Sequence, residues 1–290
     1  MYSFYTVLLE EQFVLYSVHL SSGYKGGKPV ELFRPSLQYP SYPYAEMLAR
    51  TSERYPEQVS LIFKDVNLTY RELDALVNSF ANALLDIGIR KGQRVCLLMT
   101  NRPEYLISWF AVTRIGAVAS PMNPSYKERE VAYQLSNSDA IAVIVQDNLL
   151  PLVKATRNET PELRYVIVVG SQAAENDYFS FNQLVQSYPS TLPICEAPTW
   201  DDMVALPYSS GTTGLPKGVM LSHKNLVCNA YQSIATARIT FQDRMLIFLP
   251  LYHIYGIMLM GLAASTGATM VLMERFEPGE CLRQYSRAMA

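Results

Sequence analysis

The sequence alternates, from about residue 42 onward, between short apolar runs and longer amphipathic segments, and this order constrains the fold more than any other feature. Apolar residues that recur every three or four positions indicate helices, and short apolar runs bounded by turn residues indicate strands. Repeated strand and helix units build largely parallel sheets covered by helices. The predicted fold class is therefore α/β. The segments, in order, are 44–55 (helix), 59–63 (strand), 70–87 (helix), 94–99 (strand), 103–115 (helix), 117–121 (strand), 126–138 (helix) and 140–145 (strand).

Several boundaries carry their own local signals. Thr69 and Glu72 are spaced as a capping box at the start of the helix expected over 70–87, and Gly88 is placed to end it in the left-handed conformation. Pro103 is expected to open the next helix. Between 170 and 202 the period is lost and Ser, Pro and Asn accumulate, which predicts a surface connection before a strand at 203–208.

Composition limits the class of protein and its partners. With 290 residues, 49% hydrophobic and 17% charged, the chain can bury a large core and make about two domains. A formal net charge of −2 and the lack of a sustained Lys/Arg run argue against a nucleic-acid partner. Four widely spaced cysteines without a CxxC pair predict neither disulfides nor a zinc site, so a cytoplasmic location is expected. They are Cys96, Cys195, Cys228 and Cys281.

The first 40 residues show no clear period, and we expect residues 1–40 to form an extended or poorly ordered leader. Glu10 and Glu11 interrupt its apolar run and no basic segment precedes that run, which argues against a signal peptide. No stretch reaches the roughly 18 uninterrupted apolar residues that a membrane helix requires. No transmembrane segment is therefore predicted.

The segment YSSGTTGLPKGV at 208–219 concentrates glycines, hydroxyls and one lysine. Glycines allow the close backbone approach that an anion-binding loop needs, and hydroxyls and an ammonium group donate to phosphate. The arrangement differs from a Walker loop, because Pro216 precedes and Gly218 follows the lysine. The loop is expected to join two strands, 203–208 and 218–222, before Ser222 caps a helix. The donors are Ser209, Ser210, Thr212, Thr213 and Lys217, and the glycines are Gly211, Gly214 and Gly218.

YSSGTTGLPKGVMLSH resembles the phosphate-binding signature of the adenylate-forming (AMP-binding) enzyme family, which includes acyl-CoA synthetases and coumarate-CoA ligases. The stretches at 68–124 and 247–256 resemble further blocks of the family in the expected order. The resemblance runs from about Tyr42 to the end. It implies that residues 41–290 form part of the large α/β N-terminal domain of such an enzyme.

The resemblance also implies a reaction. ATP and a carboxylic acid, fatty or aryl, would give an acyl-adenylate and pyrophosphate, and coenzyme A would then take the acyl group as a thioester. Mg²⁺ would share the phosphate charge, although the sequence shows no ligand set for it. The positions that match the family's triphosphate-binding residues are Ser209, Ser210, Gly211, Thr212, Thr213, Gly214 and Lys217, with Lys217 also in a catalytic role.

His253, in PLYHIYG, matches the histidine that borders the carboxylate in similar enzymes, and Tyr255 and Gly256 match positions that line the acyl pocket. The residues alone leave a structural role open for His253 and a core position open for Tyr255. The apolar series at 257–262 fits either an acyl-pocket wall or a buried helix face. His223, beside the cap Ser222, is interpreted as a helix-terminus residue.

The resemblance stops short of several family motifs. In the family an acidic residue for magnesium, an aspartate for the ribose, a nearby arginine and a C-terminal domain with a lysine follow later in sequence. None of these blocks is found before Ala290. A truncated chain is therefore expected, and the alternative function is a catalytically inactive fragment that binds a nucleotide or a partner.

Overall fold

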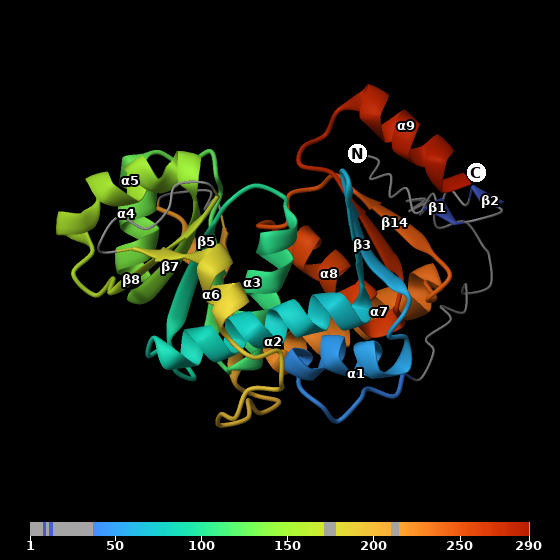
Figure 1. The fold of residues 1–290 in the computed structure, drawn as a ribbon, viewed down its shortest axis with the longest axis horizontal. Coiled ribbons are helices and arrows are strands. Elements are labelled where there is room, and N and C mark those ends of the chain that lie inside the picture. Colours follow the sequence, from blue (N-terminus) through green and yellow to red (C-terminus); the bar gives the residue numbers. More distant parts are fainter. Residues whose placement is uncertain (1–7, 10–11, 14–36, 171–177, 210–214, 290) are drawn as a thin grey trace, which may run out of the picture.

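Two sheets, with helices between and around them, form the body of the molecule in the computed structural model (Figure 1). The structure describes residues 8–9, 12–13, 37–170, 178–209 and 215–289. Most of the expected leader, residues 1–7, 10–11 and 14–36, lies outside the described residues. Its two described pieces, β1 (Leu8–Leu9) and β2 (Gln12–Phe13), pair in antiparallel fashion.

The larger sheet has seven strands in the order β13-β10-β6-β5-β7-β8-β9. Every neighbouring pair in it is parallel except β10 with β13 at one edge. The strands are β5 (Arg94–Leu98), β6 (Val118–Pro121), β7 (Ala140–Gln146), β8 (Tyr165–Val169), β9 (Phe179–Ser180), β10 (Met203–Ala205) and β13 (Leu221–Ser222).

The smaller sheet has four strands in the order β14-β15-β3-β4, with only the β3–β4 pair antiparallel. A separate hairpin of two short strands, β11 and β12, stands beside the larger sheet. The strands are β3 (Val59–Phe63), β4 (Val66–Thr69), β11 (Tyr208–Ser209), β12 (Lys217–Gly218), β14 (Arg244–Ile247) and β15 (Thr269–Leu272).

Helices cover both faces of the larger sheet and fill the space between the two sheets (Figure 1). α4 and α5 lie on its outer face, and α2, α3 and α6 lie on the inner one. The helices are η1 (Tyr44–Glu46), α1 (Met47–Arg54), α2 (Tyr70–Asp86), α3 (Pro103–Arg114), α4 (Glu128–Asn137), η2 (Asp147–Leu149), α5 (Leu150–Ala155), η3 (Arg157–Glu159), α6 (Phe181–Ser187), α7 (His223–Ala237), α8 (Ile254–Thr266) and α9 (Pro278–Met289).

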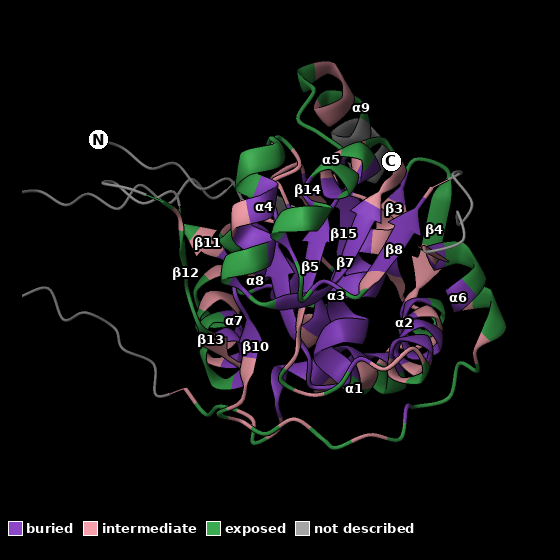
Figure 2. Cartoon of the chain, turned by 90° about the vertical axis from the view of Figure 1, so that its left-hand side faces the viewer, coloured by how far each residue is buried: buried purple, intermediate pink, exposed green. Residues whose placement is uncertain are grey.

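The central strands of the larger sheet have both faces buried. Successive side chains of a strand point to opposite faces, so in β5 Val95 and Leu97 join the core that reaches the smaller sheet, while Cys96 and Leu98 join the core beneath α4 and α5. Residues 105–114 of α3 are all buried, as Figure 2 shows. α3 is therefore enclosed by the molecule, and its largely apolar sequence follows from that position.

The local signals act as expected. Thr69 and Glu72 form the capping box at the start of α2. Gly88 adopts φ of +105° just after that helix, in the region that favours glycine. Pro103 is the first residue of α3. The predicted fold class, α/β with helices packed on largely parallel sheets, is confirmed.

Two expectations about elements were wrong, and one strand was not predicted. The unpredicted strand is β4, which precedes α2 and pairs with β3. The surface connection expected over 170–202 includes β9 and α6, where Ser180 caps the helix and Phe181 packs on Phe80 of α2 at 4.6 Å between ring centroids. The segment expected as one strand at 203–208 holds the two short strands β10 and β11, and the segment expected at 218–222 holds β12 and β13. β11 and β12 form the hairpin. Among the described residues, no helix combines the length and the apolar character that crossing a bilayer demands.

Candidate functional site

The hairpin carries two of the predicted phosphate-binding residues opposite each other. β11 and β12 are antiparallel, with Tyr208 opposite Gly218 and Ser209 opposite Lys217. Both Ser209 and Lys217 are exposed, and the Ser209 hydroxyl donates to the Lys217 carbonyl at 3.4 Å. The loop thus joins two strands, as expected. The remaining predicted residues, Ser210, Gly211, Thr212, Thr213 and Gly214, lie outside the described residues.

Helix α4 holds the hairpin from one side. The Tyr208 hydroxyl donates to Oδ1 of Asn137 at 2.7 Å, and the Tyr133 hydroxyl donates to the Pro216 carbonyl at 2.9 Å. The Tyr133 and Tyr208 rings meet edge to face, with centroids 6.3 Å apart. A Cβ on Gly218 would lie 3.2 Å from the Tyr208 ring, so glycine lets the two strands approach closely.

Burial raises the pKa of the Tyr208 phenol well above its usual value of about 10. Its hydroxyl is therefore a proton donor throughout the physiological range. Because the Asn137 oxygen can only accept, the direction of this hydrogen bond is fixed. The hydrogen bond from Tyr208 to Asn137 therefore ties the hairpin to α4 through two neutral groups.

His253 caps the N-terminus of α8. Its Nδ1 accepts a hydrogen bond from the Tyr255 backbone N–H at 3.3 Å, and its carbonyl accepts from Ile257 at 3.1 Å. The side chain is exposed. With Nδ1 accepting, the neutral ring carries its proton on Nε2, which leaves that atom as a donor. The predicted residue thus combines a capping role with an available N–H group.

Gly256 is required by close packing within the same turn. A Cβ on Gly256 would lie 2.4 Å from the Pro250 carbonyl oxygen and 2.6 Å from Cα of Leu251. Tyr255 is half-buried, and the apolar series that follows divides between the two readings left open by the sequence. Ile257, Met260 and Leu262 are buried in the core, whereas Met258 and Leu259 are half-buried and pack against it.

A hollow of about 500 Å³ lies where strands of both sheets end. Ligands of α/β proteins commonly bind beyond the carboxyl ends of the strands, and all the lining segments follow such ends. Tyr252, next to His253 in sequence, is one of the lining residues. The lining is Thr100 and Asn101 after β5, Pro124 and Ser125 after β6, Phe248, Leu249, Pro250 and Tyr252 after β14, and Glu274, Arg275 and Phe276 after β15.

Asn101 joins the two sheets at the base of this hollow. Its side-chain amide donates to the carbonyls of Leu249 at 2.9 Å and Met273 at 3.0 Å, and its Oδ1 accepts from the Leu251 N–H at 2.8 Å. Asn101 is only 4% exposed. Both the donor and the acceptor capacity of one buried amide are used to fix the chain that leads to His253.

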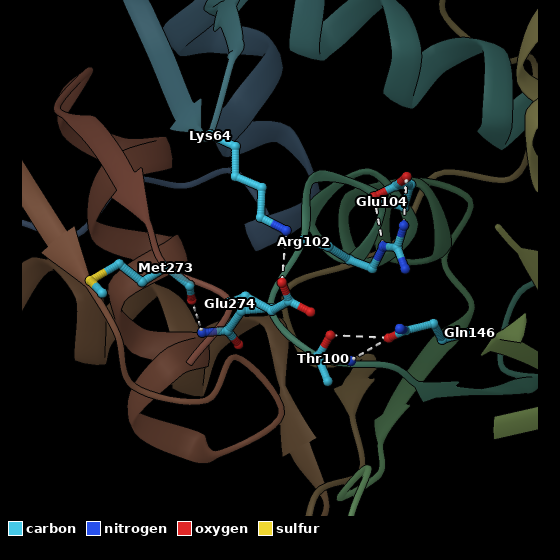
Figure 3. A network of polar contacts seen from close by, with 8 residues as sticks. Lys64, Thr100, Arg102, Glu104, Gln146, Met273 and Glu274 are labelled. Atoms are coloured by element: carbon cyan, nitrogen blue, oxygen red, sulfur yellow. Dashed lines mark hydrogen bonds and ion pairs between the residues drawn. The ribbon is translucent and has the colours of Figure 1, made fainter. Parts of the chain in front are cut away.

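Further polar contacts surround this junction, and Figure 3 shows them together. Lys64, just after β3, pairs with Glu274 at 2.8 Å, and Thr100 donates to Gln146 of β7 at 3.0 Å. The Lys64–Glu274 pair is exposed to solvent and therefore contributes little to stability. Its effect is to bring a cation and an anion to the rim of the hollow.

His223 lies at the helix terminus where the sequence placed it, with its side chain buried. It is the first residue of α7, as predicted, but it is fully buried. Its Nδ1 accepts from the Ala45 N–H at 3.4 Å. Burial lowers the pKa of the imidazole to about 4, so the ring is neutral at pH 7. The helix-terminus position is confirmed, and the structure adds that the side chain is buried there.

The resemblance implies Mg²⁺, and clusters of acidic side chains are one kind of site for it. Within the described residues, no group of three or more His, Cys, Asp or Glu side chains comes together. Carboxylate oxygens are the ligands that Mg²⁺ prefers.

Three residues that support the candidate site were not found from the sequence. Tyr133 and Asn137 were placed only within an expected helix, and Asn101 within a connection. Each acts on a segment more than 70 residues away in sequence. The four-residue spacing of Tyr133 and Asn137, which puts them on one face of α4, was the one local signal available.

Comparison with known proteins identifies relatives for nearly the whole described body. The AMP-binding enzyme family matches residues 48–287. A 4-coumarate-CoA ligase from Humulus lupulus is 36% identical over 222 residues, which are 74% of this chain and 40% of the ligase. The chain thus spans less than half the length of this relative.

Solved structures agree with the sequence relatives. An anthranilate CoA ligase in complex with anthranoyl-AMP superimposes with a TM-score of 0.79 at 29% identity, over 86% of this chain and 48% of the ligase. A long-chain-fatty-acid-CoA ligase from Archaeoglobus fulgidus gives 0.81 at 26% identity, over 88% and 52%. With the family match covering most of its length, the chain belongs to the AMP-binding enzyme family, and within it to the acyl-CoA synthetase and 4-coumarate-CoA ligase type.

Proposed function

We propose that this chain carries the phosphate-binding and acid-binding elements of an AMP-forming acid–thiol ligase. A carboxylate oxygen attacks the α-phosphorus of ATP, and the bond from that phosphorus to the oxygen that bridges to the β-phosphate breaks. Pyrophosphate departs and the acyl-adenylate is formed. Coenzyme A then loses its thiol proton to solvent, its sulfur attacks the acyl carbon, the bond from that carbon to the AMP oxygen breaks, and AMP departs as the thioester forms. Family membership supports this class of reaction.

The observation that carries the proposal is the hairpin. Ser209 and Lys217 face each other across it, both exposed, at the two ends of a segment rich in hydroxyls and glycines. Negative charge builds up on the departing pyrophosphate, and a fixed ammonium and hydroxyl aimed at it lower the barrier. Lys217 would neutralise the β- and γ-phosphates, and Ser209 would donate to the same oxygens. Ser210 to Gly214 would complete this set through their hydroxyls and backbone N–H groups.

His253 is proposed to border the acid. Its Nδ1 is engaged by the Tyr255 N–H, so Nε2–H is the group that can donate to a carboxylate oxygen. Tyr255 and Gly256 lie in the same helical turn, and half-buried Met258 and Leu259 follow. These apolar neighbours suit a fatty or aryl acid. The resemblance to an anthranilate and a long-chain-fatty-acid ligase supports both classes.

The first test is carboxylate-dependent exchange of labelled pyrophosphate into ATP by the purified chain, with a panel of fatty and aryl acids. We expect exchange with at least one acid. Lys217→Ala should lower the rate by about a hundredfold, the usual cost of removing one transition-state donor. Lys224→Ala, which removes another exposed lysine seven positions away, is the matched control and should keep the wild-type rate.

Two results would count against the proposal. Wild-type protein that exchanges no pyrophosphate with any acid would contradict acid activation by this chain. Equal rates for Lys217→Ala and Lys224→Ala would remove the hairpin lysine from the reaction.

A further inference from the structure

Helix α4 contacts the hairpin on both of its strands. The Tyr133 hydroxyl reaches the Pro216 carbonyl at 2.9 Å, immediately before β12, and Asn137 accepts from the Tyr208 hydroxyl at 2.7 Å on β11. Tyr133 and Asn137 are four residues apart and therefore lie on the same face of the helix. One helix face thus holds both strands.

Each of these contacts adjoins one of the exposed donors. Pro216 precedes Lys217, and Tyr208 precedes Ser209. Since Ser209 and Lys217 are paired in register, fixing Tyr208 and Pro216 fixes both donors relative to α4. The two-residue strands have few ladder hydrogen bonds of their own, so an external support matters more here than in a long hairpin.

The support itself is rigid. Val131 and Leu135 of α4 are buried in the core shared with β5 and β7. Glu130 closes the first turn of the helix by accepting from the Lys127 backbone N–H at 2.9 Å. The helix that holds the hairpin is therefore itself fixed to the larger sheet.

We propose that Tyr133 and Asn137 are positioning residues that hold Ser209 and Lys217 in the geometry that binds a polyphosphate. The inference rests on the proposed function, because it assigns these residues to the same phosphate site. They do not contact the ligand in this proposal. By holding the hairpin in place before the ligand binds, Tyr133 and Asn137 reduce the free-energy cost of ordering it on binding.

Single substitutions separate this role from packing. Tyr133→Phe removes the hydroxyl and keeps the ring, and Asn137→Leu removes the acceptor, whereas Asn137→Asp keeps an acceptor for the Tyr208 hydroxyl. Tyr188→Phe is the matched control, since it removes the hydrogen bond from Tyr188, the residue after α6, to Asp86 of α2, away from the hairpin. ATP affinity is measured by titration calorimetry, and KM and kcat by pyrophosphate exchange.

We expect Tyr133→Phe and Asn137→Leu each to weaken ATP binding about threefold to tenfold, as loss of one hydrogen bond predicts. KM for ATP should rise more than kcat falls. Asn137→Asp should stay within about twofold of wild type, and Tyr188→Phe should not differ from it. Hydrogen exchange of peptides covering Tyr208–Ser209 and Lys217–Gly218 should be faster in the first two variants alone.

The outcomes distinguish the two proposals. Wild-type protein that does not bind ATP would overturn the proposed function and, with it, the role given to α4. Wild-type binding that Tyr133→Phe and Asn137→Leu leave unchanged would overturn only the positioning role. So would unchanged hydrogen exchange in the hairpin, or weaker binding in Asn137→Asp equal to that in Asn137→Leu.

Discussion

The buried imidazole of His223 links the stability of the protein to pH. Its pKa is lowered to about 4 by burial, compared with about 6.5 in an unfolded chain. Between these values the unfolded state binds a proton that the folded state does not, so the free energy of unfolding falls as the pH is lowered from 6.5 towards 4. Above pH 6.5 the imidazole is neutral in both the folded and the unfolded state, and this loss of stability is absent. The shift corresponds to about 3 kcal/mol at most.

Urea unfolding of wild-type protein and His223→Gln at pH 7 and pH 4.5 measures this effect. The glutamine cannot titrate and still offers an oxygen to the Ala45 N–H. We expect the variant to lose less stability than wild type between the two pH values, by about 1–3 kcal/mol. Equal losses in both proteins would show that His223 is not responsible.

The hairpin could be proposed as an anion site from sequence because its candidate donors are neighbours in the chain. Hydroxyls, glycines and Lys217 within one short segment indicate an anion site without any knowledge of the fold. The burial of His223 could not be predicted, because it depends on Ala45, 178 residues away. The same holds for Tyr133, whose contact with Pro216 joins residues 83 apart.

A buried polar cluster joins two elements, helices α2 and α3. Arg114 donates to Asp74 and to Asn78 at 2.6 Å each, and Asn78 donates to Asp74 at 3.1 Å. The Arg114 side chain is only 4% exposed. Removing one partner would leave the other charge buried, so Asp74→Ala is expected to destabilise the protein by about 3–5 kcal/mol.

A double-mutant cycle tests this coupling by urea unfolding. Replacing both partners, as in Asp74→Leu with Arg114→Met, removes the unpaired charge and should recover most of the loss, because apolar residues often substitute well for a buried pair. If the two substitutions simply add, the cluster does not act as a unit.

Helices and strands with strong end signals could be predicted from sequence, and short ones could not. Thr69 with Glu72 and Pro103 mark the starts of α2 and α3 by local chemistry alone. Helix α6 has seven residues, too few to show a helical period, and is held by Phe181 against Phe80. Its existence depends on a tertiary contact that the local sequence does not contain.

The division into two sheets is a property of the whole molecule that the order of elements does not determine. β3 pairs with β15, more than 200 residues later, and β10 adds beside β6. A sequence that alternates strands and helices is compatible with one sheet or with two. The choice is made by long-range strand pairing and by α3, which is buried on all sides between the sheets.

Asn101 is one of the residues through which the two sheets contact each other. Asn101→Ala would leave the carbonyls of Leu249 and Met273 and the N–H of Leu251 without their partner, and we expect it to cost about 2–5 kcal/mol. Urea unfolding followed by tryptophan fluorescence and far-ultraviolet circular dichroism measures it. Because one core runs through both sheets, the two signals should change together in wild type. Separate midpoints in the wild-type protein would mean that the sheets unfold independently, and a stability of Asn101→Ala equal to wild type would mean that the amide does not join them.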